Sequence, residues 1–112
     1  MKKLEAIIQP FKLEDVKAAL ADIGVAGMTV TDVKGYGQHP VALAERRADE
    51  FFADFVPQTK IEIVLSEEKF VAALRAIVTA ARTGRFGDGK IFVIPVEEVV
   101  RIRTHERTAL AT

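Results

Sequence analysis

Lys60–Leu65 reads KIEIVL and runs directly into SEEKFVAALRAIV at Ser66–Val78. The isoleucines and the leucine of the first stretch fall at every second position, which is the spacing of a β-strand. From about Ser66 the apolar residues return at helical spacing, and Ser66 itself suits the N-cap position. The pattern stops at Thr83-Gly84, where glycine can end a helix. The segment predicts a strand followed by an amphipathic helix whose apolar face is Phe70, Ala73, Leu74, Ile77 and Val78.

The flanking segments complete the fold. Residues 3–9 alternate up to Pro10 and predict a first strand. Residues 13–23 predict a helix, with acidic residues in its first turn and Gly24 after its end. Residues 28–34 are β-branched and alternating, and residues 90–96 predict the last strand. The order β-α-β-β-α-β is typical of a single ferredoxin-like α+β domain over residues 1–112, with both helices on one face of an antiparallel sheet.

The second face of such a sheet has no helix to cover it. Several strands nevertheless keep apolar residues on both faces, for example Ile7, Val64 and Phe92. A small domain of 112 residues can cover such a face by association with copies of itself. We therefore expect a homo-oligomer.

The composition excludes several classes of function. Lys plus Arg equals Asp plus Glu at 16 each, so no net positive charge attracts nucleic acid or an anionic membrane surface. Cysteine is absent, which excludes disulfides, thiolate chemistry and cysteine metal sites. No apolar run is long enough to span a membrane, and the N-terminus does not resemble a signal peptide. We expect a soluble, cytoplasmic protein that binds no nucleic acid and does not insert into a membrane.

A glycine-rich segment, TGRFGDGK at residues 83–90, predicts a phosphate site. Its three glycines allow backbone N–H groups to turn toward an anion, and Lys90 adds positive charge. Further on, Arg101 and Arg103 lie two residues apart, so in a strand both guanidinium groups would point to the same side. The alternative is a glycine-rich hairpin with an unrelated surface arginine pair. We favour the phosphate site because both features occur together.

About twenty residues separate the second and third predicted strands, from Gln38 to Pro57. A loop of this length in a compact domain is usually functional. It contains Phe51, Phe52 and Phe55, which can order the loop against a partner or can fix its base to the body of the domain. We assign Phe55 to the base and leave the tip of the loop open.

Taken together, the chain resembles the PII nitrogen-regulatory signal-transduction proteins over its whole length. The motifs that carry the resemblance are AIIQPFKL at residues 6–13, GMTVT at 27–31, VKGYG at 33–37, KIEIV at 60–64, residues 83–93, and RIRT at 101–104. Members of this family are trimers that bind ATP or ADP between subunits and dock a long T-loop onto a target enzyme, regulator or membrane transporter. The resemblance places the T-loop at about 37–57, the phosphate loop at 83–90 and a C-terminal loop at about 98–112.

The resemblance also implies a role for individual residues. The phosphates would contact Gly87, Asp88, Gly89 and Lys90, with Arg101 and Arg103 supplied by a neighbouring subunit. The adenine would contact Thr29 and Val64, the ribose would lie near Glu62, and Gly35, Gly37 and Gln38 would border the nucleotide. Nucleotide binding would then be linked to trimerisation. Magnesium could accompany ATP.

The sequence departs from the family's pattern at three positions, two in the T-loop and one at its far base. Phe51 stands where uridylylated members have tyrosine, and the only tyrosine in the chain is Tyr36, so we expect no uridylylation. Members that sense 2-oxoglutarate have glutamine and lysine where this chain has His39 and Gln58. Losing a charge-assisted contact costs roughly 1.5–3 kcal/mol, so 2-oxoglutarate binding should be weakened or altered. Compensation by Gln38 and Lys60, or a metal or pH-sensing role of His39, remain alternatives.

The leading interpretation is a regulator, not an enzyme, that reads adenine nucleotides and controls a partner through its T-loop. One alternative is an ordinary PII protein that senses ATP, ADP and 2-oxoglutarate. A slow ATP-hydrolysing enzyme is another, with Lys90 and the arginines stabilising phosphate charge and Glu62 orienting water. A trimeric adaptor that has lost its ligands is a third, against which the intact glycine loop argues.

Overall fold

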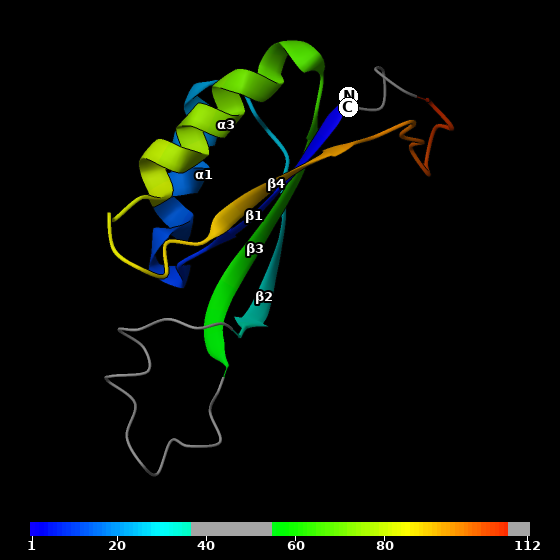
Figure 1. Cartoon of the computed structure of the whole chain (residues 1–112). Helices are drawn as coiled ribbons and strands as arrows, with labels where there is room; N and C mark the ends of the chain where they lie inside the picture. The colour runs from blue at the N-terminus through cyan, green and yellow to red at the C-terminus, as the bar shows by residue number, and fades with distance from the viewer. Residues whose placement is uncertain (37–54, 108–112) are drawn as a thin grey trace.

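The computed structural model describes residues 1–36 and 55–107. Its elements are β1 (Lys2–Ile8), the short 3₁₀ helix η1 (Pro10–Lys12), α1 (Leu13–Asp22), β2 (Thr29–Gly35), β3 (Val56–Leu65), α3 (Glu67–Ala81) and β4 (Lys90–Pro95). The predicted ferredoxin-like β-α-β-β-α-β order is confirmed. Figure 1 shows the two helices side by side on one face of the sheet.

The sheet is antiparallel, and its strand order is β2-β3-β1-β4. β1 lies in the middle, and the register pairs Leu4 with Ile63 on β3 and with Val93 on β4. β2 and β4 form the two edges. Residues that the register aligns across the strands therefore share one face of the sheet, either the helical face or the open face.

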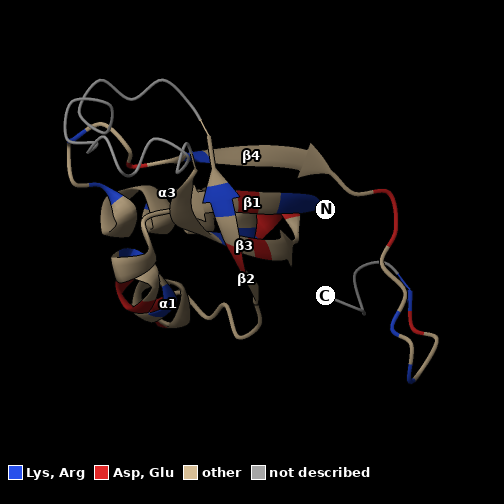
Figure 2. Cartoon of the chain, turned by 90° about the horizontal axis from the view of Figure 1, so that it is seen from below, with Lys and Arg blue, Asp and Glu red and all other residues tan. Residues whose placement is uncertain are grey.

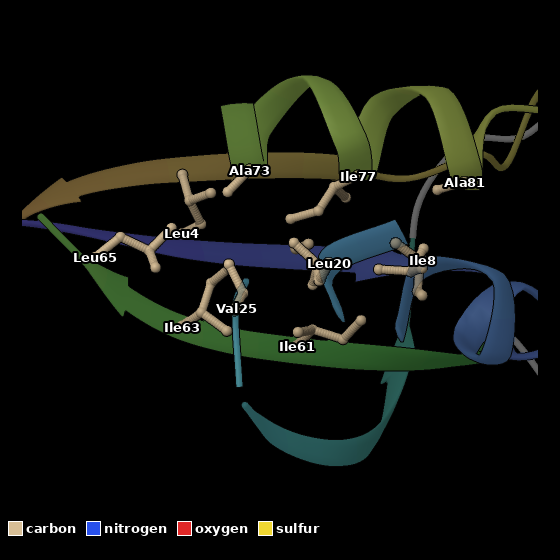
Figure 3. Close-up of a cluster of buried hydrophobic side chains, with 12 residues drawn as sticks. Leu4, Ile8, Leu20, Val25, Ile61, Ile63, Leu65, Ala73, Ile77 and Ala81 are labelled. Carbon is tan, nitrogen blue, oxygen red and sulfur yellow. The ribbon is translucent and has the colours of Figure 1, made fainter. Parts of the chain in front are cut away.

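The hydrophobic core lies between the helices and the sheet. Leu4 and Ile8 of β1, Leu20 of α1 and Ile77 of α3 are almost completely buried, and Ile61 of β3 is buried beside them. Figure 3 shows the α3 side chains pointing down onto the side chains of β1. The predicted helix face is confirmed at Ala73 and Ile77, which are buried, but not at Val78, which is half exposed. Ser66 has the backbone geometry of an N-cap, but its side chain makes no capping hydrogen bond.

β3 begins four residues earlier than the sequence predicted, at Val56 instead of Lys60. Residues 56–58 pair with the end of β2, where Gly35 is aligned with Val56 and Val33 with Gln58. The predicted loop 37–57 is therefore too long by its last two residues. The rest of the T-loop prediction, with Gly37, Gln38, His39 and Phe51, lies outside the described residues.

The open face of the sheet carries charged residues among apolar ones. Lys3 and Glu5 of β1 lie beside Lys60 and Glu62 of β3 on this face, with Val64 next to them. Figure 2 shows acidic and basic residues next to one another on these two strands. The prediction that the helices leave one face uncovered is confirmed, whereas the oligomer that would cover it stays a prediction.

The C-terminal segment differs from the prediction. Arg101 and Arg103 do not lie in a strand: the backbone forms a narrow hairpin closed by a single bridge between Val100 and Arg107. The N–H of His105 donates to the carbonyl of Arg101 at 2.9 Å, and His105 has a positive φ of 63°. The alternation of residues 101–103 has no neighbouring described strand to pair with, so a turn forms instead.

Candidate functional site

The glycine-rich loop between α3 and β4 is closed on itself by Asp88. Its carboxylate accepts hydrogen bonds from the N–H groups of Thr83 (2.8 Å) and Gly84 (2.9 Å) and from the Thr83 hydroxyl. The N–H of Arg85 in turn donates to the Thr83 hydroxyl oxygen at 3.2 Å. The hydrogen bond from the Thr83 hydroxyl, followed by those from the two N–H groups and by the charge of Arg82, lowers the pKa of Asp88. The Asp88 side chain is a brace of the loop, and its backbone N–H is the part left to contact an anion.

We predict that Asp88→Asn destabilises the fold in a pH-dependent way. A carboxyl group whose pKa is lower in the folded than in the unfolded state stabilises the fold at pH values above its unfolded pKa. This stabilisation is lost as the pH falls through the folded pKa. Because the loop is largely exposed, we expect a loss of about 1 kcal/mol at pH 7. The free-energy difference from wild type, measured by urea unfolding, should shrink toward pH 3. The control is Asp32→Asn, which replaces an exposed carboxyl group on β2. If Asp88→Asn lowered the free energy of unfolding equally at both pH values, the role of the Asp88 carboxylate in holding the loop would be wrong.

Two contacts fix the loop to the end of β1. The Gln9 side-chain amide donates to the carbonyl of Gly87 at 2.7 Å. Gly89 has a φ of 96°, and a Cβ built there would lie 1.7 Å from the carbonyl oxygen of Ile7. Only glycine allows the loop to lie this close to β1. The loop is therefore held at the end of the sheet where β1 ends and β4 begins.

This arrangement leaves several donors available to an anion. Within the described parts of the chain, the N–H groups of Phe86, Gly87 and Asp88 have no hydrogen-bond partner. Gly87 has a φ of 97°, which is the backbone conformation in which successive amides converge. Lys90 follows with an exposed side chain whose Nζ lies 5.6 Å from the Phe92 ring centroid, and it pairs with no acidic group among residues 1–36 and 55–107. The loop has the donors and the charge of a phosphate site.

Gly35, at the base of the T-loop, lies against Gln58. A Cβ on Gly35 would be 1.9 Å from Oε1 of Gln58, so the Gln58 amide covers the backbone of Gly35. Next to them, the rings of Tyr36 and Phe55 lie 5.7 Å apart. The contact is consistent with Phe55 as a residue of the loop base. At the position where the resemblance implies a lysine, the uncharged side chain of Gln58 contacts the end of β2.

Thr29, Glu62 and Val64 lie further along the open face. The register aligns Thr29 with Glu62, and Val64 is two residues beyond Glu62. Nζ of Lys3 lies 2.5 Å from Oε2 of Glu62, and this hydrogen bond is the main cause that lowers the pKa of Glu62. Glu62 is therefore a carboxylate at neutral pH, able to accept hydrogen bonds from hydroxyl groups.

Arg101 and Arg103 lie far from the glycine-rich loop of the same chain. The loop precedes Lys90 at the start of β4, whereas the hairpin with the arginines follows the end of β4 at Pro95. Figure 1 shows this hairpin extending beyond the sheet, at the opposite end from residues 82–89. Both arginines are exposed, and within residues 1–36 and 55–107 the Arg101 side chain has one ion pair, a 4.0 Å contact with Glu106. One chain brings the loop and Gly35 to the same end of the sheet, and it does not bring the arginines to them.

Sequence reasoning missed two features near these residues. A groove of about 360 Å³ lies between α3, β1 and β4 beside the loop, and Leu74, Val78, Arg82 and Ile91 are among the residues that line it. The second feature is the contact of Lys3 with Glu62. The pattern Lys-x-Glu occurs at residues 3–5 and again at 60–62, but only the register of β1 against β3 brings the two stretches together.

The described residues hold neither a metal-binding cluster nor a membrane-spanning helix. They contain no cluster of three or more His, Cys, Asp or Glu that could hold a metal ion. None of their helices is both long enough and apolar enough to cross a membrane.

Comparison with known proteins gives the family. The family model described as nitrogen regulatory protein P-II matches residues 1–106. The chain belongs to the P-II family of nitrogen regulatory proteins. Among its relatives, the nitrogen regulatory protein P-II of Azospirillum brasilense is 54% identical over 107 residues, which is 96% of each chain. That of Rhizobium meliloti is 54% identical over 106 residues, or 95% of each chain.

The P-II fold is also matched by a solved structure. The crystal structure of Arabidopsis thaliana PII bound to citrate superposes with a TM-score of 0.81 at 40% identity, over 99% of this chain and 91% of that one. The family resemblance read from the sequence is thus confirmed.

Proposed function

We propose that this P-II protein is a trimeric regulator that binds ATP or ADP and controls a partner protein through its T-loop. The observation that carries the proposal is the division of the phosphate-binding groups between the two ends of β4. The N–H groups of residues 86–88, which have no partner among the described residues, lie at one end with Lys90, and Arg101 and Arg103 lie at the other. A phosphate chain could be held by both groups only if the arginines come from a second copy.

Each part of the nucleotide would have its own contacts in this site. The phosphates would contact the N–H groups of Gly87, Asp88 and Gly89 together with Lys90. Thr29 and Val64 would contact the adenine, and Glu62 would accept from the ribose, on the open face that an adjoining copy would cover. Gly35, with Gly37 and Gln38, would border the nucleotide. Since the Asp88 carboxylate is used inside the loop, a magnesium ion would be held mainly by the oxygens of ATP itself.

The T-loop is the output of the proposed regulator. Its target would be a transporter, an enzyme or another regulator, as in the family that the chain resembles. Phe51 has no hydroxyl, so the loop would not be uridylylated at that position. Gln58 carries no charge and lies on Gly35, and His39 replaces the glutamine of the family pattern, so 2-oxoglutarate binding would be weakened or altered.

The proposal is tested by calorimetric titration of the purified protein with ATP and with ADP. We expect saturable binding of both nucleotides, and an ATP affinity that 2-oxoglutarate with magnesium changes by less than about threefold. Lys90→Ala should weaken ATP binding by about tenfold or more, because it removes one charge-assisted contact to phosphate. If neither ATP nor ADP binds, the proposed function is wrong.

A second candidate is an ordinary P-II protein that senses 2-oxoglutarate as well as nucleotides. It is favoured by the identity of 54% to two proteins named nitrogen regulatory protein P-II. The same titration separates the two candidates. If 2-oxoglutarate tightens ATP binding tenfold or more, His39 and Gln58 have been compensated and the second candidate is correct.

A further inference from the structure

Four charged side chains form a compact network on the open face of the sheet. Nζ of Lys3 lies 2.5 Å from Oε2 of Glu62 and 3.5 Å from Oε2 of Glu5. Nζ of Lys60 lies 3.8 Å from Oε1 of Glu62 and 4.0 Å from Oε1 of Glu5. The side chains are about a quarter exposed, from 24% for Glu5 to 29% for Lys3. One lysine makes a short hydrogen bond, and the other contacts are longer ion pairs.

The register explains why these residues meet. Glu5 and Glu62 are directly opposite each other on β1 and β3, where two like charges would repel. Lys3 is diagonal to Glu62 across the two strands, and Lys60 is diagonal to Glu5. This follows because each strand carries the pattern Lys-x-Glu and the strands are antiparallel. Each carboxylate therefore lies between two ammonium groups. The four charges sum to zero, and the contacts restrict the orientation of each of the four side chains.

The contribution of these ion pairs to folding stability is too small to explain the network. Partly exposed ion pairs on a sheet contribute little to folding, because solvent screens them and long side chains lose freedom. Orientation is a different effect. A glutamate has three side-chain torsions, and Lys3 restricts them by holding one oxygen of Glu62. A carboxylate has about four acceptor positions, so the Lys3 hydrogen bond leaves others free for a ligand hydroxyl.

We propose that Lys3 is a positioning residue for the nucleotide site, which holds the Glu62 carboxylate in the orientation that accepts a hydrogen bond from a ribose hydroxyl. The proposal rests on the proposed function, in which Glu62 lies near the ribose. Lys3 need not touch the nucleotide itself. Its contribution is that Glu62 is already oriented before the ligand arrives, which lowers the entropy that binding has to offset.

The proposal is tested by comparing ATP with 2′-deoxy-ATP and 3′-deoxy-ATP in calorimetric titrations. Wild-type protein should bind ATP about tenfold more tightly than at least one of the two deoxy analogues. Lys3→Met should reduce this ratio to about twofold or less, by weakening ATP binding and leaving the analogue unchanged. Lys3→Arg, which keeps the charge and the donors, should keep the ratio. A general loss of structure would weaken ATP and its analogues equally.

Lys2→Met is the matched control. This substitution removes the same charge from the neighbouring position of β1. Lys2 is aligned with Leu65 on the helical face, and it has no ion pair with another residue of the described segments. Its ratio should equal that of wild type. In a Glu62→Gln background, Lys3→Met should have no further effect on the ratio. Sedimentation velocity on every variant reports whether its oligomeric state differs from that of wild type, and Lys3→Gln replaces Lys3→Met if the latter dissociates.

The outcomes separate failure of this inference from failure of the proposed function. If wild type distinguishes ATP from a deoxy analogue and Lys3→Met does so equally well, the positioning role is wrong and nucleotide binding stands. If wild type binds ATP and both analogues alike, no ribose contact depends on Glu62 and the inference is wrong as well. If wild type binds no nucleotide, the proposed function falls, and the positioning role falls with it.

Discussion

Gly89→Ala is expected to abolish ATP binding and to destabilise the fold by about 2–4 kcal/mol. The residue has a φ of 96°, which an alanine adopts only with strain. In addition, the new Cβ would lie 1.7 Å from the carbonyl oxygen of Ile7, and this oxygen belongs to the inner strand β1, so it cannot move aside cheaply. The loop would have to leave β1, and the N–H groups of residues 86–88 would no longer converge. Urea unfolding and ATP calorimetry measure the two effects.

Two other glycines act as controls for the two causes. Gly84 has a φ of 83° with nothing within 4 Å of a built Cβ, so Gly84→Ala introduces backbone strain without a clash and should cost about 1 kcal/mol. Gly27 has neither a positive φ nor a close neighbour, so Gly27→Ala should be nearly neutral. If Gly89→Ala were no more destabilising than Gly84→Ala, the close contact between the loop and β1 would be wrong.

Replacing both Arg101 and Arg103 by alanine is expected to weaken ATP binding by about a hundredfold or more, with little change in stability. Each guanidinium would supply a charge-assisted contact worth roughly 1.5–3 kcal/mol to a phosphate. Both residues are exposed, in a hairpin that projects from the sheet, so folding of the chain depends little on them. Calorimetry gives the affinity, and thermal unfolding of the protein without nucleotide gives the stability.

Arg75→Ala is the control for loss of an exposed positive charge, since Arg75 lies on α3 away from the loop. It should change the ATP affinity by less than about twofold. A double arginine variant that binds ATP as tightly as Arg75→Ala would show that the hairpin takes no part in the site. A variant that loses both affinity and stability would mean that the hairpin is part of the folding core instead.

Much of the fold could be predicted because local signals agreed with the tertiary structure. The period of two in residues 60–65 matches a strand with one face on the core, and the spacing of Ala73 and Ile77 matches a helix that packs onto it. The start of β3 was misplaced because the alternating pattern was recognised only from Lys60, after Pro57. Proline is tolerated there because β1 ends at Ile8, opposite Thr59, so Pro57 has a strand neighbour on one side only.

The candidate site was predictable in composition but only partly in geometry. The glycines and Lys90 were recognised by their residue types, whereas the sequence could not show that Asp88 uses its carboxylate to brace the loop. Arg101 and Arg103 alternate as in a strand, yet a strand also needs a partner, and only one bridge forms at Val100. The contact of Lys3 with Glu62 depends on the register of β1 against β3, which residue spacing along a single strand does not give.

The central claim is that one nucleotide site is built from two copies of the chain, and subunit mixing tests it most directly. Lys90→Ala damages the loop side of the site, and the double arginine variant damages the hairpin side, so each protein alone should bind ATP weakly. Co-expression of the two should produce mixed trimers in which about a quarter of the sites combine an intact loop with an intact hairpin. Calorimetry should then detect that fraction of sites with wild-type affinity. Mixed trimers that bind no better than either variant alone would contradict the claim.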